Sequence, residues 1–386
     1  MKSRIVGFSG MTFKKYEGST FQLLSEVVSK AMEMASISSR EIDGLLFTIL
    51  PGTFDGKANV HFPSFQLSSF LGIKPKYIDV IDYGGPSALT MIYRAFKLIE
   101  AGEIETALCV VGGKGSFLRE NKATADSVDK FYNISLTPFD EFFRVYEDMN
   151  PVTDYALVAK RHGKLFGTTD EQRAMIAVNQ RKNAMDNDKA IYKNPITVKD
   201  VLSSRMISDP LRLLEIVYPV DGFHAFIVSK HQRNSNLRPI RIDFYGEAHW
   251  TEMPTEWKDI VYTPTVESSK GVKLEKIDAY ELYDSFTITV LLEIEDIGLA
   301  EKGKGGKFVE TTDITYRGEI PINTGGGSLN VGQPAYMSGG VILEEALLQL
   351  NDMARGHQVK GANRVLVNGI GGWNRGHAVT IVLEGE

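Results

Sequence analysis

Apolar residues recur along this chain with two alternating periods. A helical period runs over residues 19–36, with Ser19 or Thr20 as its N-cap. Short apolar runs that are typical of buried strands follow, at 43–50, 77–83, 107–111 and 220–229. Helix and strand patterns that alternate in this way predict an α/β fold, in which helices cover the faces of a sheet.

One order of elements occurs twice. In the first half, the turn Gly84-Gly85-Pro86-Ser87 leads into an amphipathic helix, then a strand, then a glycine pair. In the second half, Ser338-Gly339-Gly340 leads into a helix over about 341–353, and a strand at 364–367 closes on Gly369-Ile370-Gly371-Gly372. The repetition predicts two duplicated α/β halves that share one plan.

The predicted boundaries follow from where this rhythm stops and resumes. We place the N-terminal half at 1–233 and the C-terminal half at 234–386, with the seam in the polar stretch 232–238. From about 115 to 215 the strand–helix rhythm is absent. This stretch is more polar, helical in pattern, and rich in aromatic residues and methionine, so it predicts an inserted helical loop domain within the N-terminal half.

Composition narrows the class of protein. The 386 residues are too many for one small core. The net charge of -6, with no lysine and arginine excess in either half, argues against nucleic-acid binding. No apolar run is long enough for a membrane span. The single cysteine, Cys109, permits no internal disulfide, so we expect a cytoplasmic protein. The histidines show no ligand spacing, so no metal site is expected.

The stretch Asn323–Gly340 is rich in glycine and leads directly into the helix at 341–353. Glycine permits close backbone approach and left-handed dihedral angles. A glycine-rich loop at a helix N-terminus is a usual place to hold an anion or a developing negative charge. A plain turn needs only one or two glycines, so we interpret this stretch as a functional loop.

Several segments, in a fixed order over essentially the full length, carry a family resemblance. They are Tyr155-Ala-Leu, Phe166-Gly-Thr-Thr, Asn183-Ala-Met through Tyr192, Ser208-Asp-Pro-Leu, Val220-Asp-Gly, Glu281-Leu-Tyr-Asp-Ser-Phe-Thr287, Glu295-Asp-Ile-Gly298 and Asn323-Thr-Gly-Gly-Gly. With them the chain resembles the thiolase superfamily, specifically the sterol-carrier-protein-type thiolases, often labelled non-specific lipid-transfer proteins or acetyl-CoA acetyltransferases. The resemblance implies a five-layer α-β-α-β-α fold, coenzyme A thioesters as substrates with no covalently bound cofactor, and a homodimer or a dimer of dimers.

Where the family has its catalytic residues, this chain has others. Thiolases have a nucleophilic cysteine at the turn after the third strand, a histidine in a Gly-His-Pro loop, and a second cysteine before a terminal glycine pair. The matching positions here are Gly85, Gln333 and Gly369. Ser87 lacks the adjacent base that a serine nucleophile needs, and Cys109 lies in a predicted core strand. Acyl transfer through an acyl-enzyme is therefore not expected.

Superfamily members without the cysteine include retro-aldolases that cleave a β-hydroxyacyl-CoA, such as a steroid side chain, and that are proposed to use tyrosines. The resemblance implies Tyr336 and Tyr283 as proton carriers, and Gln333 and Asn323 as donors to the thioester oxygen. Each tyrosine has a simpler role open to it, as an amphipathic residue at a loop edge. The loop residues expected to hold the thioester are Gly85, Ser87, Gly325, Gly326, Gly371 and Gly372.

Two further residues are candidates for catalysis. Asp284 follows Tyr283 and could orient a base, although a capping or ion-pair role is equally open. His377 follows the terminal glycine pair and could polarise the thioester, or be a structural histidine. The run Lys302–Lys307 lacks the spacing of a phosphate-binding loop, so we interpret it as a solvated turn after a helix.

Three functions stay open at this point. The first is a lyase that performs retro-aldol or aldol chemistry on an acyl-CoA. The second is a non-catalytic subunit that binds acyl-CoA or lipid, and the third is a thiolase with an unrecognised nucleophile. The polar replacements Gln333, Tyr336 and Asn323 favour the lyase, because a scaffold needs no proton carrier. The resemblance also implies a small partner protein with an OB-fold and often a zinc ribbon.

Overall fold

Strands from both ends of the sequence build the centre of the computed structural model, which describes residues 3–48, 63–116, 151–251, 256–335, 339–372 and 375–386. The strands are β1 (Arg4–Phe13), β2 (Gly44–Phe47), β3 (Tyr77–Val80), β4 (Thr106–Lys114), β5 (Met206–Ser208), β6 (Leu211–Arg212), β7 (Pro219–Ser229), β8 (Ile240–His249), β9 (Ala279–Leu282), β10 (Gln333–Pro334), β11 (Arg364–Gly371) and β12 (His377–Gly385). The α-helices are α1 (Thr20–Ala35), α2 (Pro63–Leu71), α3 (Ser87–Glu100), α7 (Pro151–Phe166), α8 (Asp170–Met185), α9 (Val198–Ser203), α10 (Thr265–Ser268), α11 (Thr287–Ile297), α12 (Gly305–Thr311), α13 (Gly327–Val331) and α14 (Gly339–Leu350). Short 3-10 turns are η1 (Ser39–Glu41), η3 (Leu213–Glu215) and η5 (Leu274–Lys276).

The same strand plan occurs in both halves of the chain. The order is β3-β2-β4-β7-β1 in the first half and β8-β12-β11-β9 in the second. In each half the inner strands are parallel, β2 with β4 and β9 with β11, and antiparallel strands follow. Ile322 pairs with Tyr280 beside β9, where β3 lies beside β2 in the first half. The halves join where Ile5 of β1 pairs with Ile240 of β8.

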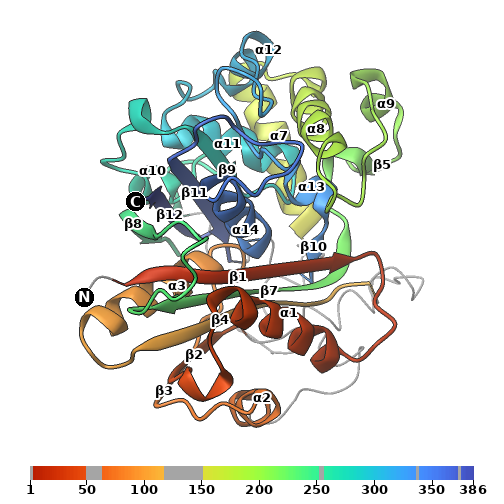
Figure 1. Ribbon diagram of the computed structural model, residues 1–386. Coiled ribbons are helices and arrows are strands. Elements are labelled where there is room, and N and C mark those ends of the chain that lie inside the picture. Colours follow the sequence, from red (N-terminus) through yellow and green to blue (C-terminus); the bar gives the residue numbers. More distant parts are fainter. Residues whose placement is uncertain (1–2, 49–62, 117–150, 252–255, 336–338, 373–374) are drawn as a thin grey trace.

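Three hydrophobic clusters separate the layers of this fold. Helix α1 packs against the outer face of the first half, for example Val27 in the same cluster as Phe223 of β7. Helices α3 and α14 lie between the two halves and share one cluster with both sheets. Helix α11 covers the outer face of the second half, with Leu291 in the cluster of Leu366. The resulting order is helix, sheet, helix, sheet, helix, which confirms the predicted five-layer fold (Figure 1).

The helices differ in how many of their faces are buried. Helix α1 buries one face, and its predicted N-cap is confirmed, because Ser19 Oγ accepts the backbone N–H of Gln22 at 3.1 Å. Helix α14 was predicted to be amphipathic, but every one of its 12 residues is buried. A helix between two sheets has no solvent face, so its polar residues Glu344, Glu345 and Gln349 are buried as well.

Strand β3 differs from its prediction. The apolar run at 77–83 predicted a buried strand, yet β3 ends at Val80, and Ile78 and Val80 are 39% and 43% exposed. The reason is that β3 is an edge strand, which pairs with β2 on one side. The expectation of burial is therefore wrong for these two side chains.

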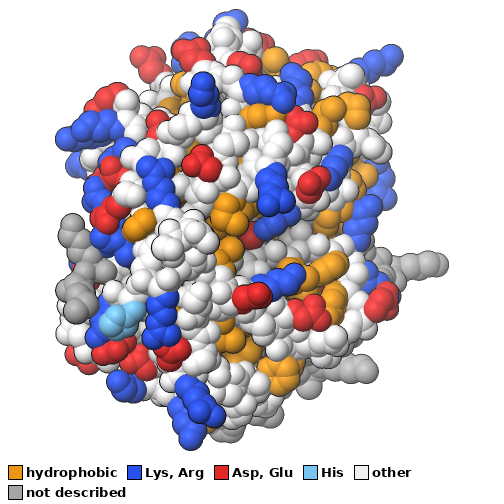
Figure 2. Space-filling model, in the orientation of Figure 1, with side chains coloured by type: hydrophobic (Ala, Val, Ile, Leu, Met, Phe, Trp, Pro, Cys, Tyr) orange, Lys and Arg blue, Asp and Glu red, His pale blue; other side chains and the backbone are white. Residues whose placement is uncertain are grey.

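The described part of the predicted insertion is largely helical. It holds α7, α8 and α9 and the short β5–β6 hairpin, and α8 packs against α11, α12 and α13 of the C-terminal half. Within the described ranges, no helix combines the length and apolar character that crossing a membrane requires. On the face drawn in Figure 2, Lys and Arg side chains are interspersed with Asp and Glu rather than gathered in one patch.

Candidate active site

Three glycine segments from distant parts of the sequence touch one another. The carbonyl of Gly85 lies where a side chain at Gly339 would begin, and Gly85 N lies 2.7 Å from the β-carbon position of Gly371. Helices α3 and α14 both begin at this contact, at Ser87 and Gly339. The positive ends of two helix dipoles therefore converge here, which favours a negative charge at this point.

Tyr283 lies against this contact from the end of β9. A β-carbon at Gly85 would approach Tyr283 Cδ2 to 2.7 Å and would also overlap the carbonyl of Ile370. The tyrosine is buried, and its backbone N–H donates to Glu293 Oε2 and to the carbonyl of Asn368, each at 3.1 Å. The Tyr283 ring therefore occupies the space that a side chain at position 85 would need.

Asn323 opens the glycine loop in a left-handed conformation, with φ of 49°. Its backbone N–H donates to the Tyr280 carbonyl, and its Oδ1 accepts the N–H of Leu282 at 2.7 Å, so the residue is fixed along β9. The side chain is fully buried, and within the described residues its Nδ2 has no hydrogen-bond partner. A buried donor without a partner is expensive, unless a ligand supplies the acceptor.

Gln333 is the first residue of β10, which pairs in parallel with Pro219 and Val220 of β7. The side chain is buried, and its Oε1 has no hydrogen-bond partner among the described residues. A 180° rotation of the terminal amide would put a donor in the place of this oxygen. Tyr336 lies three residues further on and outside the described residues, so its predicted role stays a prediction.

Asp284 is occupied by contacts within the fold. Its carboxylate is fully buried and accepts the backbone N–H groups of Ser328 and Leu329 at 2.9 and 3.0 Å. Gln180 of α8 donates to it at 2.6 Å. Burial raises the pKa of Asp284, and these hydrogen bonds oppose that shift. The geometry fits a residue that anchors the glycine loop to β9 and α8. Both carboxylate oxygens already accept hydrogen bonds, which argues against Asp284 as the base.

His377 belongs to an aromatic cluster at the ends of β8 and β12. Its Nδ1 lies 2.9 Å from His249 Nδ1, and its ring centroid lies 5.3 Å from that of Tyr83. Burial, followed by the nearby His249, lowers the pKa of His377, so the imidazole is neutral at pH 7. His377 is paired with Gly371 across the β11–β12 ladder, beside the glycine contact.

The remaining predicted loop residues have contacts that explain their identity. Ser87 Oγ accepts the N–H of Tyr83 at 2.8 Å, within its own turn. A side chain at Gly325 would meet Asn187 and Glu345, and one at Gly326, with φ of 96°, would overlap Ala184 of α8. A side chain at Gly372, with φ of 84°, would be strained. Their predicted contacts with a thioester stay predictions.

Several buried ionisable groups near the site were not identified as functional from the sequence. Tyr155 of α7 stacks on Phe286 with centroids 4.2 Å apart, and the guanidinium of Arg375 lies 5.0 Å from the Tyr155 ring centroid. Glu281 and Glu293 are fully buried, and burial raises the pKa of each well above its usual range. A signal was present for the glutamates, since both interrupt strongly apolar runs.

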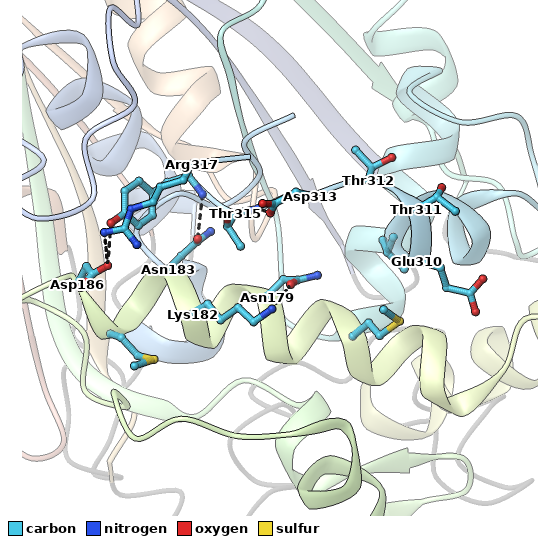
Figure 3. A pocket seen from close by; sticks show the side chains of 14 residues that line it. Asn179, Lys182, Asn183, Asp186, Glu310, Thr311, Thr312, Asp313, Thr315 and Arg317 are labelled. Carbon is cyan, nitrogen blue, oxygen red and sulfur yellow. Dashed lines mark hydrogen bonds and ion pairs between the residues drawn. The ribbon is translucent and has the colours of Figure 1, made fainter. Parts of the chain in front are cut away.

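A groove of about 720 Å³ lies between α8 and the segment 309–317 (Figure 3). Its walls are one face of α8, including Asn179 and Lys182, and the segment 309–317. Asn183 borders both the groove and the glycine loop, because its Nδ2 donates to the Asn323 carbonyl at 3.0 Å and its Oδ1 accepts the N–H of Tyr316. The groove does not contain any of the predicted catalytic residues.

Other sequence candidates lie away from this contact. Cys109 is fully buried in β4, and burial raises the pKa of its thiol, as expected for a packing residue. Lys302 follows the glycine C-cap of α11 and forms an ion pair with Asp296, so this run closes a helix. Within the described ranges, no group of three or more His, Cys, Asp and Glu residues could hold a metal ion.

Comparisons with known proteins relate this chain to thiolase-like proteins. Residues 246–384 match the family model "Thiolase C-terminal domain-like". An acetyl-CoA acetyltransferase of Methanothermobacter thermautotrophicus is 34% identical over 59% of this chain, and the match spans 62% of that protein, less than two thirds of its length. A 17-hydroxy-3-oxo-4-pregnene-20-carboxyl-CoA lyase of Mycobacterium tuberculosis is 27% identical over 95% of each chain. The solved structure "Ltp2-ChsH2(DUF35) aldolase" has a TM-score of 0.83, 23% identity, and coverage of 100% of this chain and 98% of that one, which shows a shared fold.

Proposed function

Because the chain belongs to the thiolase superfamily, we propose that it is an acyl-CoA aldolase, which cleaves or forms a carbon–carbon bond in a β-hydroxyacyl-CoA. The observation that carries this proposal is the contact between Tyr283 and Gly85, the position that the resemblance matches to the family's nucleophilic cysteine. A phenol can move a proton but is a poor acceptor of an acyl group at neutral pH. The lyase and aldolase names of two matched proteins support the same reaction class.

The reaction needs one proton acceptor and a site for one developing negative charge. Tyr283, as a tyrosinate, takes the proton from the β-hydroxyl and becomes a phenol. The Cα–Cβ bond breaks, and its electron pair forms the enolate of the shortened thioester. The β-carbon leaves as a carbonyl compound, and the enolate then takes up a proton at Cα. Tyr336 is the second proton carrier in this proposal.

In this proposal, two helix N-termini and two side-chain amides stabilise the enolate oxygen. The N-termini of α3 and α14 converge at the glycine contact, and the buried Nδ2 of Asn323 can donate a hydrogen bond. Gln333 supplies a further donor from β10. Coenzyme A enters as part of the substrate, and the glycine segments Gly85, Gly371 and Gly372 let its thioester approach the backbone closely.

We further propose two partners, a second copy of the chain and a different, smaller subunit. The edge strand β3 exposes Ile78 and Val80 and leaves one side unpaired within the described residues, which suits pairing with a second copy of the chain. A second subunit of the DUF35 kind, as the matched aldolase structure is described, would complete the acyl-CoA pocket. Light scattering of the protein alone would test the dimer.

Cleavage of defined thioesters tests the reaction. A panel of β-hydroxyacyl-CoA thioesters, from short chains to steroid side chains, is incubated with the protein, alone and with a co-expressed DUF35-type subunit. Mass spectrometry should find a shortened acyl-CoA and a carbonyl product in equal amounts. If calorimetry shows that acyl-CoA binds but no panel member is cleaved under either condition, the non-catalytic binding subunit is the better account.

A further inference from the structure

Behind the glycine loop, two buried glutamates share one threonine hydroxyl. Glu281 comes from β9, Glu345 from α14, and Thr324 from the loop itself. Thr324 Oγ1 lies 2.6 Å from Glu281 Oε1 and 3.0 Å from Glu345 Oε1. All three side chains are buried.

A count of hydrogens shows that this arrangement needs one more proton. Two oxygen–oxygen contacts run through Thr324 Oγ1, but the hydroxyl carries a single hydrogen. If both carboxyls were ionised, one of the contacts would join two acceptors with no hydrogen between them. A proton on one of the two carboxyls gives both oxygen–oxygen contacts a hydrogen. Gln349 Nε2 donates to Thr324 Oγ1 and to Glu345 Oε1, so it bridges the Thr324–Glu345 contact but not the Thr324–Glu281 contact.

The neighbours of the two carboxyls indicate which one holds the proton. Glu345 Oε1 faces two nitrogen groups, Gln349 Nε2 and His357 Nε2 at 2.9 and 3.0 Å. His357 Nδ1 faces the Arg355 carbonyl, an acceptor, so that nitrogen carries a hydrogen as well. Burial lowers the pKa of His357, but its contact with Glu345 outweighs this and raises the pKa, which favours the imidazolium form of His357.

Glu281 has the opposite surroundings. The charged groups that face it are Glu345 and Asp284, both acidic, and no cation is in contact with it among the described residues. Its Oε2 is buried with no hydrogen-bond partner in that part of the chain. Burial, and then Glu345, raise the pKa of Glu281 well above its usual range. A protonated Glu281 donates to Thr324, which donates to Glu345 in turn.

This hydrogen-bonded group adjoins the candidate active site. Glu281 is on β9, and Tyr283 directly follows the last residue of that strand. The N–H of Tyr283 donates to the Asn368 carbonyl, which continues the pairing with β11, so the side chains of Glu281 and Tyr283 point to the same face. Thr324 follows Asn323 in the sequence. Asn323 Oδ1 accepts the N–H of Leu282, which lies between Glu281 and Tyr283. Thr324 N also donates to Glu281 Oε1, at 3.1 Å. Two successive loop residues, Asn323 and Thr324, are thus hydrogen-bonded to Leu282 and Glu281 of β9.

We propose that Glu281 in its protonated form is a positioning residue, which holds Asn323 beside Tyr283 through Thr324, and that ionisation of Glu281 loosens this hold. The catalytic part of the inference rests on the proposed aldolase function. The protonation part rests on the folded protein alone and can be tested without a substrate.

Thermal unfolding as a function of pH tests the proton. Glu281→Gln keeps the shape and a donor to Thr324 but cannot ionise. In the wild type, the unfolded chain releases the Glu281 proton above about pH 4.3, whereas the folded protein retains it, so stability falls as pH rises from there. The Tm of Glu281→Gln minus that of the wild type should therefore grow by about 2 °C or more between pH 5 and pH 8. Glu319→Gln, at an exposed residue, is the matched control and should give a constant difference.

Enzyme kinetics tests the positioning. Thr324→Val should lower kcat about tenfold to a hundredfold with a smaller change in KM, and Thr324→Ser should restore it. Glu281→Gln should keep kcat within about threefold of the wild type at pH 7. As the pH rises, the kcat of the wild type should fall when Glu281 ionises, and Glu281→Gln should not show this part of the fall. A Tm difference that stays flat or shrinks with pH overturns the protonated Glu281. A wild-type kcat in Thr324→Val overturns the positioning role, and absence of any cleaved substrate counts against the aldolase but leaves the Tm result standing.

Discussion

The ring of Tyr283 occupies the space in which a side chain at position 85 would begin, with Tyr283 Cδ2 2.7 Å from the β-carbon position of Gly85. The absence of a side chain at position 85 and the observed position of the Tyr283 ring are therefore linked by packing. A cysteine at position 85 and the observed tyrosine rotamer cannot coexist.

Gly85→Cys should therefore not create a thiolase. The new side chain would overlap both the Tyr283 ring and the Ile370 carbonyl, and overpacking of this kind costs about 1–3 kcal/mol. We expect a lower Tm and background thiolysis of acetoacetyl-CoA. Ser235→Cys, at an exposed residue, controls for the added thiol. Robust thiolysis by Gly85→Cys at an unchanged Tm would contradict the packing described here.

Tyr283→Phe should remove a proton carrier with little effect on the fold. Loss of a general base costs on the order of 100- to 10,000-fold in rate. We expect C–C cleavage to fall within about that range, while acyl-CoA affinity measured by calorimetry stays within about tenfold.

Tyr280→Phe is the matched control, because this tyrosine is on the same strand but packs in the cluster on the opposite face. It loses the hydrogen bond to the Leu274 carbonyl and should retain its cleavage rate. Tyr336→Phe should resemble Tyr283→Phe, and the double variant should lose less than the product of the single losses if the two tyrosines form one relay. Equal rates for Tyr283→Phe and Tyr280→Phe would exclude Tyr283 as the base.

Gln333→Ala should weaken enolate stabilisation. Removal of one oxyanion donor costs about 3 kcal/mol of transition-state stabilisation, so kcat should fall about 100-fold. Gln333→Glu tests the sign of the charge at this place, because a carboxylate near the enolate should lower kcat at least as much. A Gln333→Ala variant with the wild-type kcat would show that the amide does not reach the thioester oxygen.

The thiol of Cys109 should be inert in the folded protein. Burial raises its pKa, and only the thiolate reacts with iodoacetamide. Labelling followed by mass spectrometry should be slow under native conditions and rapid in guanidinium chloride. Rapid native labelling with loss of an acyl-transfer activity would identify Cys109 as the missing nucleophile.

The sequence was sufficient for the fold, because the features that decide it are local and repeated. The periodicity of α1, the glycine turns before α3 and α14, and the strand after each helix all lie within short segments. The burial of Cys109 was predicted for the same reason and is confirmed. The exposed side chains of β3 were missed, because edge position depends on strand order, which the apolar pattern of one strand does not contain.

The site was harder to predict, because its contacts join residues that are far apart in the sequence. Gly85 and Tyr283 meet only after the two halves pack on α3 and α14. Asp284 accepts from Gln180, and this contact depends on where α8 of the insertion lies. Residue type alone left Asp284 open as base or anchor, and its three donors favour the anchor.

The measurement that tests the central claim most directly combines product analysis with intact-protein mass spectrometry in a single turnover. A β-hydroxyacyl-CoA that the wild type consumes is mixed with excess protein and quenched at several times. The account predicts equal amounts of carbonyl product and shortened acyl-CoA, no dependence on free coenzyme A, and an unchanged protein mass throughout. A protein mass raised by an acyl group, or cleavage that requires free coenzyme A, would contradict it.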